Sequence, residues 1–219
     1  MTQFLETIRA AVPTAQLTIA LLGPPRIALD GLPLSFAYEK VSALLVYLAV
    51  EADRAHTRTA LADLLWPEQG EAAARHSLSQ ALFQLRRSLH DDPANPLVLT
   101  TRTSVRLSPN PAIWLDVTAF HQLLRGAAVN VPQLKQASAL YRGEFLEGWS
   151  IDGSAGFEEW LLLTREHLHV RACDVLRQLT EPHALGDGDA TELCDHARRW
   201  VALDPLCEEA YRRLMRALA

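Results

Sequence analysis

The sequence has few cysteines, no long apolar run and no phosphate-binding glycine loop. Its three cysteines, Cys173, Cys194 and Cys207, are an odd number, and we interpret them as small buried side chains rather than a disulfide framework. No apolar run reaches the roughly 20 residues that a membrane helix needs. The first eleven residues also lack the basic and apolar regions of a signal peptide. These absences predict a cytoplasmic protein that makes no membrane contact.

Recognisable catalytic and metal-binding motifs are also missing. There is no Gly-x-x-x-x-Gly-Lys-Ser/Thr loop and no Gly-x-Ser-x-Gly elbow, so the residues assign neither nucleotide hydrolysis nor a serine nucleophile. Of the residues that could suggest a metal site, His169 and Cys173 are four apart and would be neighbours on a helix, whereas Cys194 and His196 would point in different directions. His167 is two residues before His169, so the three residues His167, His169 and Cys173 would not all lie on one face of that helix. Because structural zinc sites usually show tighter ligand pairs, we predict no enzyme, no metal and no cofactor.

Charge is distributed unevenly along the chain. Residues 1–113 hold ten basic and ten acidic side chains, so the whole net charge of −5 comes from residues 114–219. Within residues 71–106, five arginines accompany three acidic residues. Because the local distribution matters more than the total for binding a polyanion, this modest basic island leaves nucleic-acid binding open.

The first half of the chain alternates short strands with helices. The apolar periodicity changes from two to 3.6 residues near residue 40, Asp30-Gly31 is a tight-turn signal, and Thr57 suits a helix N-cap. Strands are expected over 17–22, 26–29, 32–34, 97–101 and 104–107, and helices over 40–50, 58–65 and 71–89. The order predicts an α+β domain over residues 17–110, preceded by an N-terminal arm over residues 1–16.

The second half of the chain reads as helical. Residues 108–111 are rich in proline and form the clearest linker. The last two expected helices meet at Leu203-Asp204-Pro205, a compact junction typical of a TPR unit. Helices are expected over 116–125, 132–142, 156–181, 191–203 and 207–218, with no strand. Residues 111–219 are therefore predicted to form an all-α, TPR-like domain.

The helix over 71–89 has two distinct faces. Four leucines at positions 78, 82, 85 and 89 fall within about 60° of one another and form a core stripe. No carboxylate occurs between Arg75 and His90, and Gln, Arg and aromatic side chains can all contact base edges. The candidate DNA-contacting residues here are Arg75, His76, Ser79, Gln80, Phe83, Gln84, Arg86 and Arg87. Any solvent-exposed helix can present such a face, so the helix alone does not distinguish DNA contact from an ordinary solvated surface.

The tip of the predicted hairpin over residues 97–107 carries Thr101, Arg102 and Thr103. Short hydroxyl side chains, backbone N–H groups and an arginine suit phosphate or minor-groove contact. A plain solvated turn explains the hairpin equally well when it is taken alone. The order of strands, three helices and hairpin is more specific, and it predicts a double-stranded DNA partner.

That order resembles the OmpR-type winged helix, and the whole chain resembles the SARP-type regulators, which join this domain to a bacterial transcriptional activator domain. The stretches that carry the resemblance are residues 61–67, 77–89, 140–146, 157–160, 165–166 and 204–210. The resemblance implies a sequence-specific transcription regulator, an activator, whose recognition helix is 71–89 and whose wing is 100–105. It also implies that Arg86 and Arg102 favour phosphate or the minor groove, and that residues 67–70 contact RNA polymerase.

Two features depart from the family pattern. Phe83 and Gln84 stand where OmpR-type recognition helices often carry Arg or Lys, and the arm over residues 1–16 has no counterpart. The resulting weak charge predicts modest affinity for one copy, so we expect a homodimer, a pair of molecules on a direct or inverted repeat.

A different function also fits parts of the sequence. In this alternative the winged helix has weak or no affinity for DNA, and the acidic half is a helical module that binds a protein or ligand. The aromatic residues Tyr141, Phe145, Trp149, Phe157 and Trp160 gather around a glycine-rich loop. We interpret them as packing that loop and the long helix against the first domain, while a small-molecule pocket is the other interpretation.

Overall fold

The structure is a computed structural model that describes residues 16–109, 112–126, 129–181 and 190–219. The chain divides into two compact units that interleave along the sequence. Unit 1 comprises Met1–Ala20, Pro25–Leu115 and Gly148–Leu162, and unit 2 comprises Leu21–Pro24, Asp116–Glu147 and Leu163–Ala219. Apart from Gln16, the predicted N-terminal arm lies outside the described residues. Among the helices described, none is both long and apolar enough to cross a membrane.

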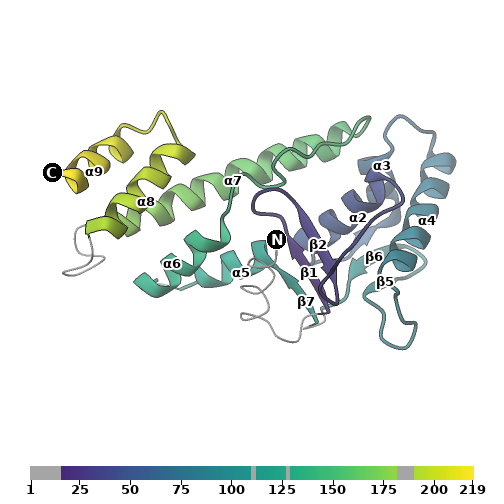
Figure 1. Cartoon of the computed structure of the whole chain (residues 1–219). Helices are drawn as coiled ribbons and strands as arrows, with labels where there is room; N and C mark the ends of the chain where they lie inside the picture. Colours follow the sequence, from purple (N-terminus) through teal and green to yellow (C-terminus); the bar gives the residue numbers. More distant parts are fainter. Residues whose placement is uncertain (1–15, 110–111, 127–128, 182–189) are drawn as a thin grey trace. The chain divides into compact units, whose positions relative to one another are not determined.

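Unit 1 opens with a four-stranded sheet in the order β3-β2-β1-β7 (Figure 1). Strands β1 (Leu17–Ala20), β2 (Arg26–Leu29) and β3 (Leu32–Pro33) form the expected antiparallel meander. Its turn uses Asp30 and Gly31, whose φ angles are 49° and 79°. Because this left-handed conformation favours Asp and Gly, the predicted turn is confirmed.

The fourth strand corrects one expectation. Only helices were expected after the linker, but β7 (Ile113–Leu115) pairs in parallel with β1, with Leu17 opposite Ile113. Three residues are too few to show a strand periodicity, so the pairing partner rather than the local pattern creates this strand. Strand β7 belongs to unit 1.

Three helices pack against the sheets of unit 1: α2 (Glu39–Val50), α3 (Arg58–Leu65) and α4 (Glu71–Ser88). The hydroxyl of Thr57 accepts a hydrogen bond from the Ala60 N–H at 3.1 Å. This satisfies one of the amide groups left free at a helix start, which confirms the predicted N-cap. All three helices begin and end within one residue of the expected bounds.

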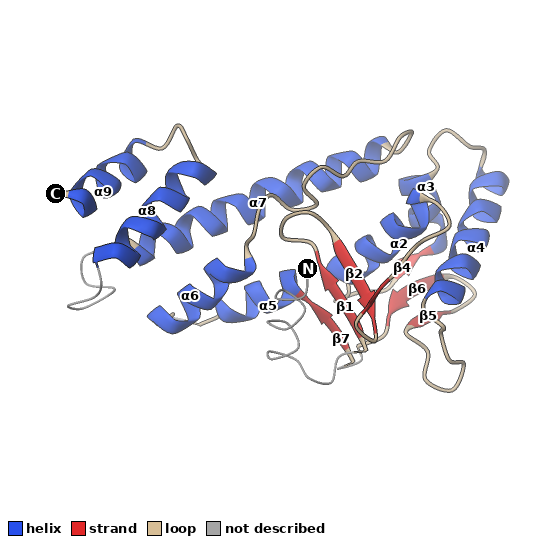
Figure 2. Cartoon of the chain, viewed as in Figure 1, coloured by secondary structure: helices blue, strands red, loops and turns tan. Residues whose placement is uncertain are grey.

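A second sheet has the order β4-β6-β5, and its strands β5 and β6 follow α4 in the chain (Figure 2). Strands β5 (Val98–Thr100) and β6 (Ser104–Leu107) form the expected hairpin. Strand β4 (His56–Thr57) was not expected, because its two residues carry no alternation, and it pairs with β6. The sheets, three helices and terminal hairpin make an α+β winged-helix fold.

The segment Gly148–Leu162 returns to unit 1 from later in the chain. The buried Ser154 hydroxyl donates to the Leu65 carbonyl at 2.8 Å. The Trp160 indole N–H donates to the Glu51 carboxylate at 3.1 Å, and its ring meets Tyr47 at 5.1 Å between centroids. This packing agrees with a structural role for the aromatic residues of the segment.

Unit 2 is a helical assembly with TPR-like helix pairing. Its helices are α5 (Asp116–Leu123), α6 (Val131–Leu140), residues 163–179 of α7 (Ala155–Leu179), α8 (Ala190–Leu203) and α9 (Glu208–Leu218). Asn130 and Gln133 form a reciprocal capping box at the start of α6. Arg199 on α8 donates to the Ser138 hydroxyl at 3.0 Å and to the Tyr141 carbonyl. Helices α8 and α9 lie side by side (Figure 1).

A buried carboxylate organises the start of α5. Asp116 accepts backbone hydrogen bonds from Leu21 and Leu22 at 2.7 and 2.8 Å and from Val117 at 2.8 Å. The Arg142 guanidinium lies 3.5 Å from the same carboxylate. Burial raises the pKa of Asp116 to about 6, although the backbone N–H donors and Arg142 act in the opposite direction. Asp116 thus links residues 21–22 to the helices of unit 2.

Candidate DNA interface

Helix α4 has the two faces expected from its sequence. The four leucines of its core stripe are all less than 5% exposed. On the other side His76, Ser79, Gln80, Phe83 and Arg87 are exposed. Phe83 is 61% exposed, which is unusual for a large aromatic side chain on a polar surface. The outward face of α4 therefore presents amide, imidazole, guanidinium and aromatic groups to the surroundings.

The start of α3 lies against the first turns of α4. The Arg58 guanidinium donates to the Ser79 hydroxyl at 3.0 Å, and Arg75 donates to the Thr59 hydroxyl at 3.4 Å. Arg75 also pairs with Glu71 at 2.6 Å, which offsets part of its charge. Arg58 was not among the predicted site residues. The sequence gives no local signal for Arg58, because only tertiary packing places it beside the outward face of α4.

The wing turn is organised by one threonine. The Thr101 hydroxyl oxygen accepts hydrogen bonds from the backbone N–H groups of Thr103 and Ser104 at 3.2 and 2.9 Å. The Arg58 N–H donates to the Thr103 carbonyl at 2.9 Å, which brings the wing tip to the start of α3. Thr101, Arg102 and Thr103 are all exposed. The hydroxyl of Thr101 serves the turn itself, whereas the Arg102 guanidinium makes no ion pair with any residue that the structure describes.

Arg86 and Arg87 are neighbours in sequence but face different surroundings. Arg86 donates to the Val98 carbonyl at 3.1 Å and to the Thr100 hydroxyl at 2.6 Å, both on β5. Its guanidinium also lies 3.7 Å from Asp91, whose side chain is only 3% exposed. Arg86 therefore ties α4 to the wing, and these contacts compete with its predicted contact to DNA. Arg87 is exposed and forms no ion pair within the described part of the chain.

Gln84 is half-buried, at the edge of the outward face of α4. The structure thus brings most of the predicted residues to one surface of unit 1, formed by the start of α3, the outward face of α4 and the wing. We call this the α4–wing surface. Its cations are Arg58, Arg75, Arg87 and Arg102, with Arg86 at its inner edge. An 18-residue helix is about 27 Å long, so α4 is long enough to follow the major groove of DNA.

The loop between α3 and α4 has a different character. Pro67 and Glu68 are exposed, and the Lys40 ammonium lies 3.4 Å from the Glu68 carboxylate and 5.7 Å from the centre of the Trp66 ring. A shallow hollow beside the loop is lined by residues of 67–68 and 150–158, including the acidic side chains Asp152 and Glu158. This loop offers acidic and apolar groups rather than the cations of the α4–wing surface.

Two protein families match separate parts of this chain. Residues 38–105 match the family described as transcriptional regulatory protein, C terminal, and residues 115–219 match the bacterial transcriptional activator domain. The structure of Mycobacterium tuberculosis EmbR in complex with a low affinity phosphopeptide is 20% identical, with a TM-score of 0.63. The match covers 92% of this chain and 54% of that one, and at this identity it shows the fold alone. A search of curated proteins gives no match.

The fold and the two matched families define a transcription regulator with a winged-helix domain and a helical domain. Both families consist of transcription regulators rather than enzymes. This chain thus carries both an OmpR-type winged helix and a bacterial transcriptional activator domain, which is the domain arrangement of the SARP-type regulators.

Proposed function

We propose that this chain is a cytoplasmic activator that binds double-stranded DNA sequence-specifically, with α4 in the major groove and the wing on the backbone or minor groove. The observation that carries the proposal is the α4–wing surface. Its helix has no carboxylate from Arg75 to His90, its outward side chains are exposed, and Arg58 and Arg102 flank it. An acidic side chain there would be repelled by phosphate, and its absence removes that barrier.

The side chains divide by chemistry. Gln80 and Gln84 can donate to and accept from an adenine edge, Arg87 can pair with guanine, and Phe83 can contact a thymine methyl group. Arg58, Arg75 and Arg102 suit phosphate, with His76, Ser79, Thr101 and Thr103 around them. Four cations make a weak electrostatic surface, so a homodimer on repeated sites would multiply a modest affinity.

The proposal also gives the α3–α4 loop a role. Pro67 and Glu68 are exposed beside an acidic hollow, and an acidic surface would not compete for DNA. We propose this loop as the contact with RNA polymerase, as the resemblance implies. A Glu68→Ala variant should then keep its affinity for DNA and lose activation of a promoter.

The direct test replaces Gln80 and Arg87 together by alanine. Each lost base contact reduces affinity by about 1–3 kcal/mol, so the double variant should bind its operator at least about thirtyfold more weakly. Both side chains are exposed, so the thermal transition should stay nearly unchanged. A Gln136→Ala/Arg198→Ala variant, which removes the same side-chain types from exposed positions in unit 2, is the matched control. Parental affinity in the Gln80/Arg87 variant would refute the recognition-helix assignment.

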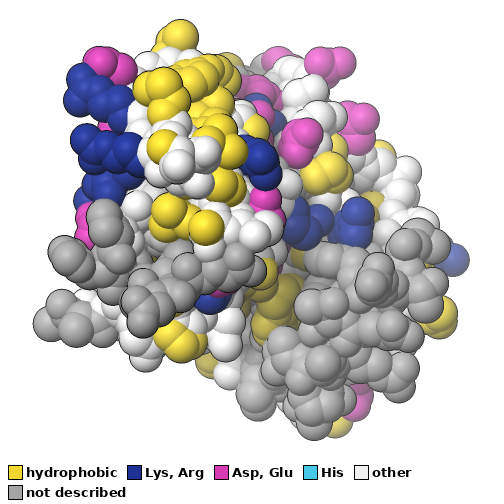
Figure 3. Space-filling view, turned by 60° about the vertical axis from the view of Figure 1, so that its left-hand side comes forward, with side chains coloured by type: hydrophobic (Ala, Val, Ile, Leu, Met, Phe, Trp, Pro, Cys, Tyr) yellow, Lys and Arg dark blue, Asp and Glu magenta, His cyan; other side chains and the backbone are white. Residues whose placement is uncertain are grey.

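A helical protein-binding module is the second candidate, and exposed apolar side chains on helix α9 and in the turn before it favour this function. Leu206, Tyr211, Met215 and Leu218 are 95%, 43%, 63% and 61% exposed. Figure 3 shows hydrophobic side chains gathered in a band, with Lys and Arg beside it. Exposed apolar patches often mark contacts with other proteins. If protein binding is the main function, Met215→Glu/Leu218→Glu should abolish activity in cells and Gln80→Ala/Arg87→Ala should leave it intact. If sequence-specific DNA binding is the main function, Gln80→Ala/Arg87→Ala should be inactive.

A further inference from the structure

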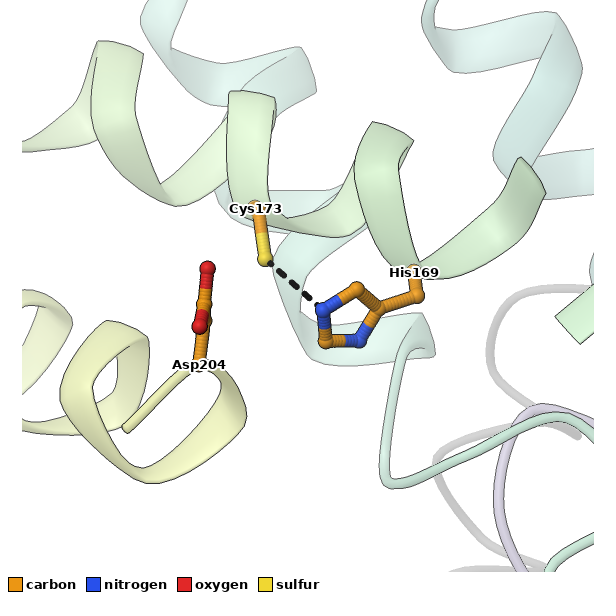
Figure 4. A group of neighbouring side chains, drawn as sticks. All are labelled: His169, Cys173 and Asp204. Carbon is orange, nitrogen blue, oxygen red and sulfur yellow. Dashed lines mark hydrogen bonds between the residues drawn. The ribbon is translucent and has the colours of Figure 1, made fainter. Parts of the chain in front are cut away.

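Three metal-ligating side chains converge in unit 2, far from the α4–wing surface in sequence. His169 and Cys173 lie one turn apart on α7, and Asp204 lies in the turn between α8 and α9 (Figure 4). The ligand atoms of these three residues all lie within 4.8 Å of one another, and all three residues are half-buried. Two elements that are distant in sequence thus supply an imidazole, a thiol and a carboxylate to one point.

The spacing of these atoms suits a tetrahedral metal ion. The Cys173 sulfur lies 3.6 Å from His169 Nε2. Zinc binds thiolate sulfur at about 2.3 Å and imidazole nitrogen at about 2.0–2.1 Å, so sulfur and nitrogen at two corners of a tetrahedron are about 3.6 Å apart. The two α7 ligands are therefore already at a metal-binding separation. Asp204 requires only a shift of its carboxylate toward them.

A buried apolar cluster borders the three side chains. Cys173 packs against Leu176, Trp200 and Ala210. An apolar shell on one side of a metal site restricts the access of water to its ligands. The thiol would release its proton when it binds the ion.

We propose that His169, Cys173 and Asp204 form a binding site for a divalent transition-metal ion of the zinc type, with water as its fourth ligand. One nitrogen, one sulfur and one oxygen ligand suit zinc and cobalt and disfavour calcium and magnesium, which prefer oxygen. The ion joins α7 to the α8–α9 turn. The four-residue spacing of His169 and Cys173 makes them neighbours on one helix, whereas only the folding of unit 2 brings Asp204 beside them.

The simpler account is a weak hydrogen bond between a cysteine and a histidine, with Asp204 serving its own turn. Asp204 does accept a hydrogen bond from the Leu206 N–H at 3.3 Å. That contact uses Oδ1 and leaves Oδ2 available for another partner. Only a metal site would bind added metal, so a metal titration distinguishes it from a simple hydrogen bond between Cys173 and His169.

The test uses the full chain without an affinity tag, freed of metal by a chelator and titrated with Co²⁺. We expect one equivalent to produce a thiolate-to-cobalt absorption band and visible bands of tetrahedral intensity, and Zn²⁺ to displace them. Zn²⁺ at a hundredfold excess over its Kd should also raise Tm by about 5–10 °C. A chain that shows no such band and no rise in Tm would overturn the proposal.

Variants identify the ligands. Cys173→Ser should abolish the charge-transfer band, and His169→Gln and Asp204→Asn should each weaken binding at least about 100-fold. Cys194→Ser is the thiol control and His167→Gln is the imidazole control, because these side chains lie outside the group; both should bind as the parent does. If Cys173→Ser failed to fold, the other two ligand variants would still decide. A band that survived in the ligand variants or vanished in the controls would refute the assignment.

Discussion

The adjacent arginines of α4 provide a sharp test of how the winged helix is built. Arg86 is held by β5 and by the nearly buried Asp91, whereas Arg87 is exposed. We predict that Arg86→Ala lowers the stability of unit 1, and that Arg87→Ala leaves stability unchanged and weakens DNA binding. The same chemical change one position apart should thus affect two different properties.

The magnitude follows from the contacts of Arg86. Its hydrogen bonds to the Val98 carbonyl and the Thr100 hydroxyl involve a charged donor, and each such bond is worth about 1.5–3 kcal/mol when buried. The Arg86 side chain is 42% exposed, so solvent screening reduces the combined effect to about 2 kcal/mol. For a chain of this length that corresponds to a Tm lower by about 4–8 °C. Arg87→Ala should change the free energy of unfolding by less than about 0.5 kcal/mol.

Calorimetry and operator titration on the two variants measure both properties. Arg87→Ala should reduce affinity by about 1–3 kcal/mol, and if Arg87 contacts phosphate, the slope of log affinity against log salt should fall by about 0.9. Arg86→Lys is the control for charge alone, and it should recover only part of the lost stability because an ammonium cannot reproduce the planar donor pair. Equal melting temperatures for the parent and Arg86→Ala would refute the role of Arg86 as a link.

Two further predictions concern stability. Thr57→Ala removes the N-cap of α3 and should lower the free energy of unfolding by about 1 kcal/mol in urea titration, whereas Thr57→Ser should retain the cap; equal loss in both would contradict the capping role. Asp116 binds its proton more tightly in the folded protein than at its ordinary pKa of 3.8, so its stabilising contribution is complete below pH about 4 and is lost as the pH rises through about 6. Relative to Asp116→Asn, the parent should therefore lose about 3 kcal/mol over that range, and a stability difference that did not change with pH would contradict the raised pKa.

Local sequence patterns predicted much of the fold. The leucine stripe of α4, the turn at Asp30-Gly31 and the cap at Thr57 are each decided by residues within a few positions of one another. Periodicity and cap chemistry act over that same short range. They consequently located the helices and the wing hairpin to within a few residues.

The parts that escaped prediction depend on pairing between distant segments. Strands β4 and β7 contain two and three residues, and only their partner strands make them strands. The inward contacts of Arg86, the approach of Arg58 to Ser79 and the meeting of Asp204 with Cys173 also arise from tertiary packing. A helical wheel shows which way a side chain points but not which distant element receives it.

The most direct test of DNA reading is selection of bound sequences from a random double-stranded pool, performed in parallel with the parent and with Gln80→Ala/Arg87→Ala. We predict that the parent enriches a defined sequence present in two copies, and that the double variant fails to enrich it. Absence of any enriched sequence with the parent, or recovery of the same sequence by the double variant, would contradict the assignment of α4 as the recognition helix.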